Sequence, residues 1–223
     1  MLTSRFGIEI EFTGITRSEA ARVTAEYFGG TITSVGDYYD TKKVIAPDGR
    51  VWKLMSDGSI SCQKRSGRQK VAATREYSVE LVSPILTYRE DIECLQELVR
   101  RLRKAGAFAN ASCGIHIHLD GSNHTPRSIR NFINIIASKN DLFYKALQIA
   151  PERMNYCKKM DSILVDKMNR RKPKTMRAIE EIWYEGYSES RDRHYHNSRY
   201  HFLNLHSFFT GNHTVELRGF NSE

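Results

Sequence analysis

The chain has 223 residues, 40% of them hydrophobic, which suffices for one full core and favours a single soluble domain. Its formal net charge of +8 indicates an anionic partner, whether nucleotide, acidic peptide or nucleic acid. The short apolar runs argue against a membrane span, and the polar N-terminus argues against a signal peptide. Four scattered cysteines argue against a zinc cage. We therefore expect a cytoplasmic protein with reduced thiols.

The first predicted strand, residues 6–12, alternates strictly between apolar and acidic side chains. Ile8 and Ile10 share one face, and Glu9 and Glu11 share the other. Two carboxylates on one strand face lie about 7 Å apart, so each of them is able to hold one ion of a metal cluster.

A capping box, Thr16-Arg17-Ser18-Glu19, then predicts a helix that ends at Gly29. Two strands, Thr31 to Tyr39 and Val51 to Met55, are expected on either side of a turn at Pro47-Asp48-Gly49. Asp57 comes next and immediately precedes a glycine, a position where an aspartate more often forms a turn than binds a ligand.

Between residues 61 and 75 the chain carries five basic side chains and no acidic one: Lys64, Arg65, Arg68, Lys70 and Arg75. A charge run of this kind is usually a solvated loop. The alternative is a mobile flap over a polyphosphate or an acidic substrate. A strand from Tyr77 to Leu81 should then deliver Glu80, with Pro84 marking its end.

Three further helices are expected. One opens at a second capping box, Thr87 to Glu90, and stops near Gly106; the next opens at Thr125-Pro126 and extends toward Leu147; the third covers Thr175 to Tyr184. Their apolar stripes should cover the apolar side of a sheet.

The strand Cys113 to Asp120 places His116, His118 and Asp120 on one face and apolar side chains on the other. An ordinary polar pair explains a histidine beside an aspartate equally well. Two histidines on one strand also lack the closed ligand spacing of a zinc finger.

The last predicted strand, Thr214 to Phe220, shows the same alternation, with Glu216 and Arg218 on one face. A strand from Tyr200 to Phe208 is expected before it, and Arg199 at its start is a plausible phosphate contact. The repeated pattern predicts an α+β fold, in which a mainly antiparallel sheet carries helices on one face and the active site on the other.

Residues 151–198 are predicted to be a basic insertion that helps to form the substrate mouth. RNA binding is the rival explanation of their charge, although no RNA-binding signature is present. His194, His196, His201 and His206 follow no known ligand spacing, so we expect polar surface histidines rather than a second metal site.

Taken in order, these motifs resemble the amidoligase family. They are Gly-Ile-Glu-Ile-Glu-Phe at residues 7–12, Asp57-Gly58-Ser59, Glu80-Leu81-Val82-Ser83-Pro84, Cys-Gly-Ile-His-Ile-His-Leu at 113–119, and Val-Glu-Leu-Arg at 215–218. That family belongs to the carboxylate-amine ligases related to glutamine synthetase and γ-glutamylcysteine ligase. The resemblance implies a glutamine-synthetase-like catalytic fold and an ATP-dependent ligase that forms an amide or peptide bond through an acyl phosphate.

The resemblance also implies roles for individual residues of these motifs. Mg²⁺ or Mn²⁺ would be held by the metal ligands Glu9, Glu11, Glu80, His116 and Glu216, with Asp57 a weaker candidate. Arg218 and Arg199 would contact phosphate as catalytic and nucleotide-binding residues, and His118 would bind nucleotide or substrate. Only five residues follow Arg218, which implies either a minimal family member or a shortened chain.

Two other function classes stay open. A metal-dependent amide hydrolase could use the same carboxylates to activate water, and its indifference to ATP would distinguish it from a ligase. A non-catalytic protein that binds an acidic peptide or nucleic acid would show a salt-sensitive affinity that ignores Mg²⁺. The carboxylate and amine substrates themselves, whether peptide, amino acid or cell-wall fragment, are not specified by the sequence, and no membrane partner is expected.

Overall fold

The computed structural model describes residues 5–222 and divides them into two compact units. The first unit extends to Ile117 and takes up the chain again from Asn221, and the second is His118–Phe220. The described residues form seven α-helices, and none of these is both long and apolar enough to cross a membrane. The predicted α+β class is therefore confirmed, whereas a single catalytic domain stays a prediction.

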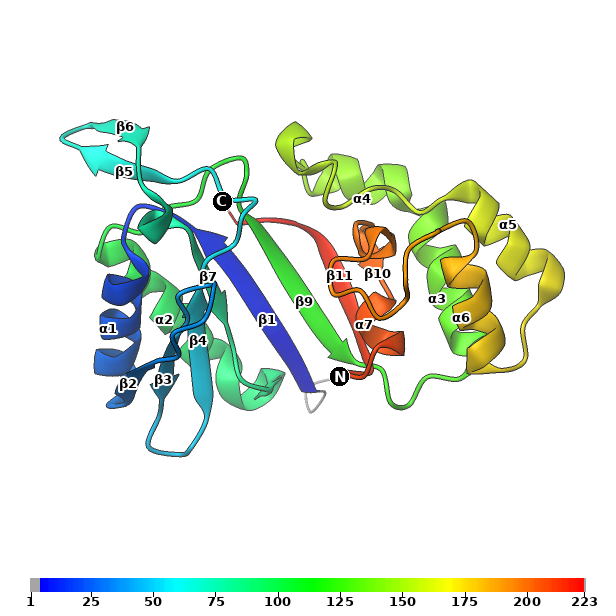
Figure 1. Ribbon diagram of the computed structural model, residues 1–223, viewed down its shortest axis with the longest axis horizontal. Helices are drawn as coiled ribbons and strands as arrows, with labels where there is room; N and C mark the ends of the chain where they lie inside the picture. Colours follow the sequence, from blue (N-terminus) through cyan, green and yellow to red (C-terminus); the bar gives the residue numbers. More distant parts are fainter. Residues whose placement is uncertain (1–4, 223) are drawn as a thin grey trace. The chain divides into compact units, whose positions relative to one another are not determined.

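The first unit is built on an antiparallel sheet (Figure 1). Its strand order is β9-β1-β7-β4-β3-β2, and β8 also pairs with β1. The strands are β1 (Arg5–Phe12), β2 (Thr31–Ser34), β3 (Lys42–Ile45), β4 (Val51–Met55), β7 (Val79–Val82), β8 (Leu86–Thr87) and β9 (Gly114–Asp120). The last three residues of β9 belong to the second unit.

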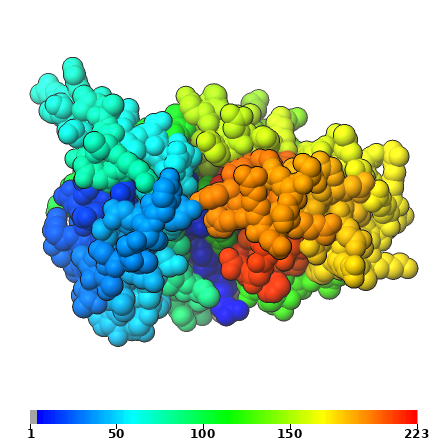
Figure 2. Space-filling model, in the orientation of Figure 1, coloured from blue at the N-terminus to red at the C-terminus, as the bar shows by residue number. Residues whose placement is uncertain are grey.

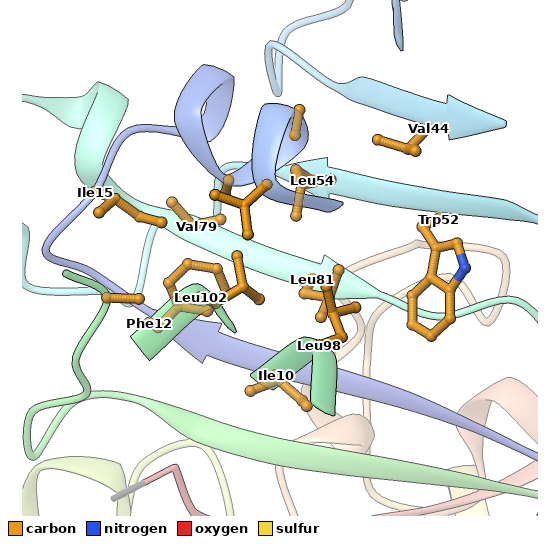
Figure 3. Close-up of a cluster of buried hydrophobic side chains, with 14 of the residues drawn as sticks. Ile10, Phe12, Ile15, Val44, Trp52, Leu54, Val79, Leu81, Leu98 and Leu102 are labelled. Atoms are coloured by element: carbon orange, nitrogen blue, oxygen red, sulfur yellow. The ribbon is translucent and has the colours of Figure 1, made fainter. Parts of the chain in front are cut away.

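Two helices, α1 (Arg17–Phe28) and α2 (Tyr88–Lys104), pack on one face of this sheet. The core between the two helices and the sheet is formed by side chains at alternate strand positions together with the buried side chains of the helices (Figure 3). The buried set includes Ile10, Phe12, Trp52, Leu54, Val79, Leu81, Leu95, Leu98 and Leu102. Because side chains alternate along a strand, Glu9, Glu11 and Glu80 lie on the opposite face. In this unit, the helices and the carboxylates therefore occupy opposite faces, as predicted.

The ends of these helices follow the expected chemistry in part. The Thr16 hydroxyl accepts a hydrogen bond from the Glu19 amide, and Gly29 ends α1 with a φ of 66°. At α2, Thr87 makes no side-chain cap; instead, the Asp91 carboxylate accepts the Thr87 amide at 2.7 Å. The capping box predicted for α2 is therefore wrong in its mechanism, although the helix itself is present.

The region between α1 and β4 holds one strand more than predicted. The extended segment expected from Thr31 to Tyr39 ends at Ser34, and the chain returns along β2 as β3. The turn at Pro47-Asp48-Gly49 then joins β3 to β4. Lys42 and Lys43 open β3, and their charge concealed a strand whose hydrophobic part is only two residues long.

The basic segment is a regular hairpin rather than an irregular loop. Strands β5 (Gln63–Ser66) and β6 (Gln69–Ala72) pair antiparallel as a separate two-stranded sheet. Gly67, with a φ of 60°, provides the left-handed residue that the tight turn needs.

The second unit is mainly helical. It contains α3 (Pro126–Ser138), α4 (Asn140–Ala146), α5 (Ser162–Arg171), α6 (Met176–Tyr184), α7 (His206–Phe209), and the antiparallel strands β10 (Leu203–Asn204) and β11 (Thr214–Asn221). A second core joins the helices to the strands: Ile129, Ile133, Met168, Ile179, Trp183, Leu203, Leu205 and Val215 are buried together. Thr125 caps α3 as predicted, and the Thr175 hydroxyl accepts the Ala178 amide at the start of α6.

One strand prediction in this unit is wrong. The segment predicted as a strand from Tyr200 to Phe208 keeps only Leu203 and Asn204 in β10, and α7 begins at His206. The Asn204 side-chain oxygen accepts the His206 amide at 2.7 Å, a local bond of the kind that favours a turn over a continuing strand. Arg199 consequently lies in a 3₁₀ turn, Asn197–Arg199, rather than at a strand start.

Candidate functional site

The carboxylate face of the first unit gathers five predicted metal ligands from four different segments. Two overlapping groups have ligand atoms that all lie within 4.8 Å of one another: Glu9, Glu80 and His116 form one, and Glu11, Asp57 and Glu80 form the other. Glu9 and Glu11 lie on β1, and the strands on either side of it carry Glu80 (β7) and His116 (β9). Asp57 follows β4. Glu80 belongs to both groups, so the two could share a bridging carboxylate.

His116 lies between the two carboxylates of β1. Its Nδ1 is 2.9 Å from Glu9 Oε2, and its Nε2 is 3.7 Å from Glu11 Oε1. The other oxygen of Glu11 accepts the Gly114 amide at 2.6 Å. His116 and Glu11 are 4% and 3% exposed, so this part of the site is almost dry and electrostatic interactions in it are strengthened.

The register of the sheet sets two like charges against each other. Glu11 on β1 is the direct antiparallel partner of Glu80 on β7, and both are almost buried. Like charges directly opposite each other destabilise a sheet, and burial increases the cost of each charge. A divalent cation at this position would turn the repulsion into attraction.

Asp57 is fixed by two serines. Its carboxylate accepts the Ser59 amide at 2.6 Å and also the Ser59 hydroxyl, as an aspartate in a turn does. Its backbone is held by Ser78: the Asp57 amide donates to the Ser78 hydroxyl at 2.9 Å, and that hydroxyl donates to the Asp57 carbonyl at 2.7 Å. Asp57 is therefore both a turn former and a member of the carboxylate group, two readings that the sequence had set against each other.

A buried arginine that sequence reasoning missed supports this arrangement. Arg17 is 5% exposed, and it donates to the Ser78 carbonyl at 2.8 Å and to the Arg75 carbonyl at 2.6 Å. It also forms an ion pair with Asp40 at 2.9 Å. The available signal was its place at the first position of α1, but a basic side chain there reads as exposed.

In the second unit, Glu216 and Arg218 on β11 form a buried ion pair with each other. The second Glu216 oxygen accepts the Asn204 amide group at 2.6 Å. Arg153, itself buried, donates to the Arg218 carbonyl at 2.7 Å and so fixes the backbone of this strand. The structure thus shows Arg218 as the partner of a neighbouring carboxylate, and its phosphate role stays a prediction.

The two other residues assigned to phosphate or nucleotide lie in different surroundings. Arg199 donates to the His194 carbonyl at 3.0 Å and lies over the ring of Tyr195. His118 Nδ1 is 3.5 Å from the Thr214 hydroxyl. Neither contact tests the predicted roles.

The expectation of four surface histidines is wrong for two of them. His196 and His206 are buried and stack on each other with ring centroids 5.3 Å apart. His206 Nδ1 is 2.6 Å from the Tyr184 hydroxyl, and Tyr184 packs edge-on against both rings. Burial, with a contribution from His196, lowers the pKa of His206, and burial raises the pKa of Tyr184. Among the described residues, none of these histidines belongs to a group that could hold a metal ion.

Comparison with known proteins gives one result. Residues 2–223 match the model of a family described as "putative amidoligase enzyme". No curated protein and no solved structure matches the chain.

Proposed function

Since the chain belongs to the amidoligase family, we propose that it is an ATP-dependent carboxylate-amine ligase. In the proposed reaction, a substrate carboxylate attacks the γ-phosphorus of ATP and releases ADP, and an amine then displaces phosphate from the acyl phosphate to give an amide. We also infer that the fold is glutamine-synthetase-like, which the antiparallel sheet with a carboxylate face supports.

The observation that carries this proposal is the pair of overlapping ligand groups that share Glu80. They offer four carboxylates and one imidazole, a donor set that suits Mg²⁺ or Mn²⁺ rather than the cysteine and histidine tetrahedron of structural zinc. The like-charged pair of Glu11 and Glu80 also fits a cation at this place. Bound divalent ions would neutralise the triphosphate of ATP and stabilise the charge on its transferred phosphoryl group.

The chain's own residues would prepare the site in three ways. Rigid, neighbouring strands fix the spacing of Glu9, Glu11 and Glu80 without the entropy cost of ordering a loop. The low exposure of Glu11 and His116 would exclude water, which competes with the amine for an acyl phosphate. The two hydrogen bonds between the Ser78 hydroxyl and the Asp57 backbone would keep Asp57 at its position.

The roles of four residues of the second unit are part of the proposal and rest on the family resemblance. Glu216 is assigned to metal, Arg218 and Arg199 to the phosphoryl group, and His118 to nucleotide or substrate. The ion pair between Glu216 and Arg218 supports a fixed orientation for both side chains.

The test is nucleotide binding by protein that has been treated with a chelator. ATP should bind only after Mg²⁺ or Mn²⁺ is restored. Glu80→Gln should abolish this metal-dependent ATP binding, because a neutral amide is a poor ligand for a hard cation. Glu26→Gln is the matched control, since it makes the same chemical change on the exposed face of α1. ATP-independent amide hydrolysis, or restoration by Zn²⁺ alone, would favour a metal-dependent hydrolase and contradict the ligase proposal.

A further inference from the structure

The β5–β6 hairpin presents four exposed cations: Lys64, Arg65, Arg68 and Lys70. Among the residues that the structure describes, none of the four forms a salt bridge with a carboxylate. Figures 1 and 2 show the hairpin projecting from the surface of its unit. Some exposed arginines elsewhere in the chain have an acidic partner, such as Glu26 for Arg22 and Glu97 for Arg101.

Two of these cations directly oppose each other. Arg65 and Lys70 are antiparallel partners in the hairpin, so their side chains leave the ladder on the same face. Both lie over the ring of Phe108, Arg65 at 5.4 Å and Lys70 at 4.5 Å from its centroid. Like charges directly opposite are destabilising, and the contacts with the aromatic ring act against that repulsion without removing either charge. An anion bound between the two cations would remove it.

The root of the hairpin lies beside the carboxylate face. The Thr13 hydroxyl donates to the Gln63 carbonyl and accepts the Gln63 amide, both at 2.8 Å. Thr13 follows Glu9 and Glu11 at alternate positions and so shares their face of the strand. Phe108, the floor beneath the two cations, exchanges backbone hydrogen bonds with the same Thr13 at 2.9 Å. Arg65 and Lys70 therefore lie past Glu11 along the direction in which Glu9 and Glu11 follow one another on β1.

We propose that Arg65 and Lys70, on the floor formed by Phe108, bind an acidic group of a polycarboxylate substrate, most simply an acidic peptide. This inference rests on the proposed function in one respect, namely that another carboxylate of the same molecule is the one activated at the metal ligands. Arginine gives planar, bidentate recognition of a carboxylate, and Lys70 adds a second charge beside it. Lys64 and Arg68 would extend the same attraction along a longer acidic chain.

The experiment measures binding of fluorescein-labelled pentaglutamate to the full chain by fluorescence anisotropy, without nucleotide, at low and moderate salt. Wild-type protein should bind pentaglutamate, should bind pentaglutamine far more weakly, and should lose affinity as salt rises. The double variant Arg65→Gln/Lys70→Gln should weaken binding about tenfold, because two charge-assisted contacts are removed.

The matched control is Arg103→Gln/Lys104→Gln, which removes one arginine and one lysine from exposed positions in the last turn of α2. It makes the same change in net charge and should alter pentaglutamate affinity less than about twofold. The melting temperature of the hairpin variant should change little, since removal of the like-charge pair offsets the loss of the two contacts with Phe108. A preserved melting temperature separates loss of binding from loss of fold.

Several outcomes would overturn the proposal. Equal losses in the two double variants would show attraction by net charge only. Loss of Mg-ATP affinity with pentaglutamate binding intact would assign the hairpin to nucleotide phosphates, and a preference for single-stranded RNA of equal charge would assign it to nucleic acid. Selective loss in the hairpin variant supports the proposal even if the chain never consumes ATP, so failure of the ligase function is distinguishable from failure of this inference.

Discussion

Two antiparallel ladders of the first unit each set like charges against each other, and they do so in opposite environments. Glu11 opposes Glu80 where both are almost buried, whereas Arg65 opposes Lys70 on an exposed hairpin. Water screens the exposed pair, so its repulsion is small and an anion adds modest stability there. The buried pair is screened far less, and a cation should change both its stability and its chemistry.

A third pair of similar groups, His196 and His206, removes repulsion in another way. These rings are buried and stacked, and the lowered pKa of His206 keeps that ring neutral. Arg65 and Lys70 have no such route, because a guanidinium and an exposed ammonium keep their charge near neutral pH. The pairs Glu11–Glu80 and Arg65–Lys70 are therefore the better candidates for ligand sites, and the histidine pair, which is packed among aromatic rings, is better explained as core.

The largest expected effect concerns Arg218, where a buried carboxylate faces an opposite charge instead of a like one. Arg218→Lys should lower kcat by about 100-fold or more, the scale of removing one transition-state donor, because an ammonium lacks the planar fork that tracks phosphate oxygens. Steady-state kinetics with ATP and an accepted substrate would measure it, and the KM for ATP should change little. Normal turnover with unchanged ATP saturation would leave Arg218 as a purely structural partner of Glu216.

The comparison of the two like-charged ladders can be tested by thermal unfolding with and without metal. At a Mn²⁺ concentration of about 100 times Kd, the wild-type protein should gain about 2.7 kcal/mol. Glu11→Gln should lose most of this gain, and its metal-free form should be no less stable than the wild type because one buried charge has been removed. An equal Mn²⁺ effect in both proteins would contradict a metal site at the Glu11 and Glu80 pair.

A smaller effect is expected at Ser78, which holds the backbone of Asp57 through two hydrogen bonds. Ser78→Ala should cost about 1–2 kcal/mol in the free energy of unfolding, because a partly buried amide and carbonyl lose their partner. It should also weaken Mn²⁺ binding severalfold by loosening Asp57. Urea denaturation and metal titration would measure the two effects, with Ser66→Ala on the exposed hairpin as the control. Unchanged metal affinity in a destabilised variant would remove Asp57 from the metal site.

Period-two alternation was sufficient to predict the strands that carry the candidate ligands. It placed Glu9, Glu11, Glu80 and His116 on the faces where the structure has them, because a buried opposite face fixes the register of each strand. Asp57 was harder to predict, since its position depends on Ser78, 21 residues away in the chain.

The failures share a cause, which is that tertiary contacts override local pattern. Arg17 is buried although arginine usually is not, because three long-range acceptors satisfy its guanidinium: Asp40 and the carbonyls of Arg75 and Ser78. His196 and His206 are buried because aromatic rings and a tyrosine hydroxyl surround them. The segment that contains His206 alternates like a strand, yet the Asn204 side chain closes a turn there and α7 begins at His206.

The smallest expected effect is the pH dependence of stability that arises from the buried ring of His206. Burial lowers the pKa of His206 from 6.5 in the folded protein, so the unfolded chain takes up a proton first as the pH falls. The stability from this group is therefore complete above pH 6.5 and is lost as the pH falls from 6.5 through the lowered folded pKa. The slope should be at most about 1.4 kcal/mol per pH unit for one group. His201, whose pKa burial also lowers, adds a slope of the same sign. Urea denaturation at pH 7.5 and 5.5 would measure the sum, and His206→Asn, which cannot take up that proton, should show a smaller difference between the two pH values even though it is less stable at both. An identical difference in the variant would mean that His206 is not the group that couples folding to protons.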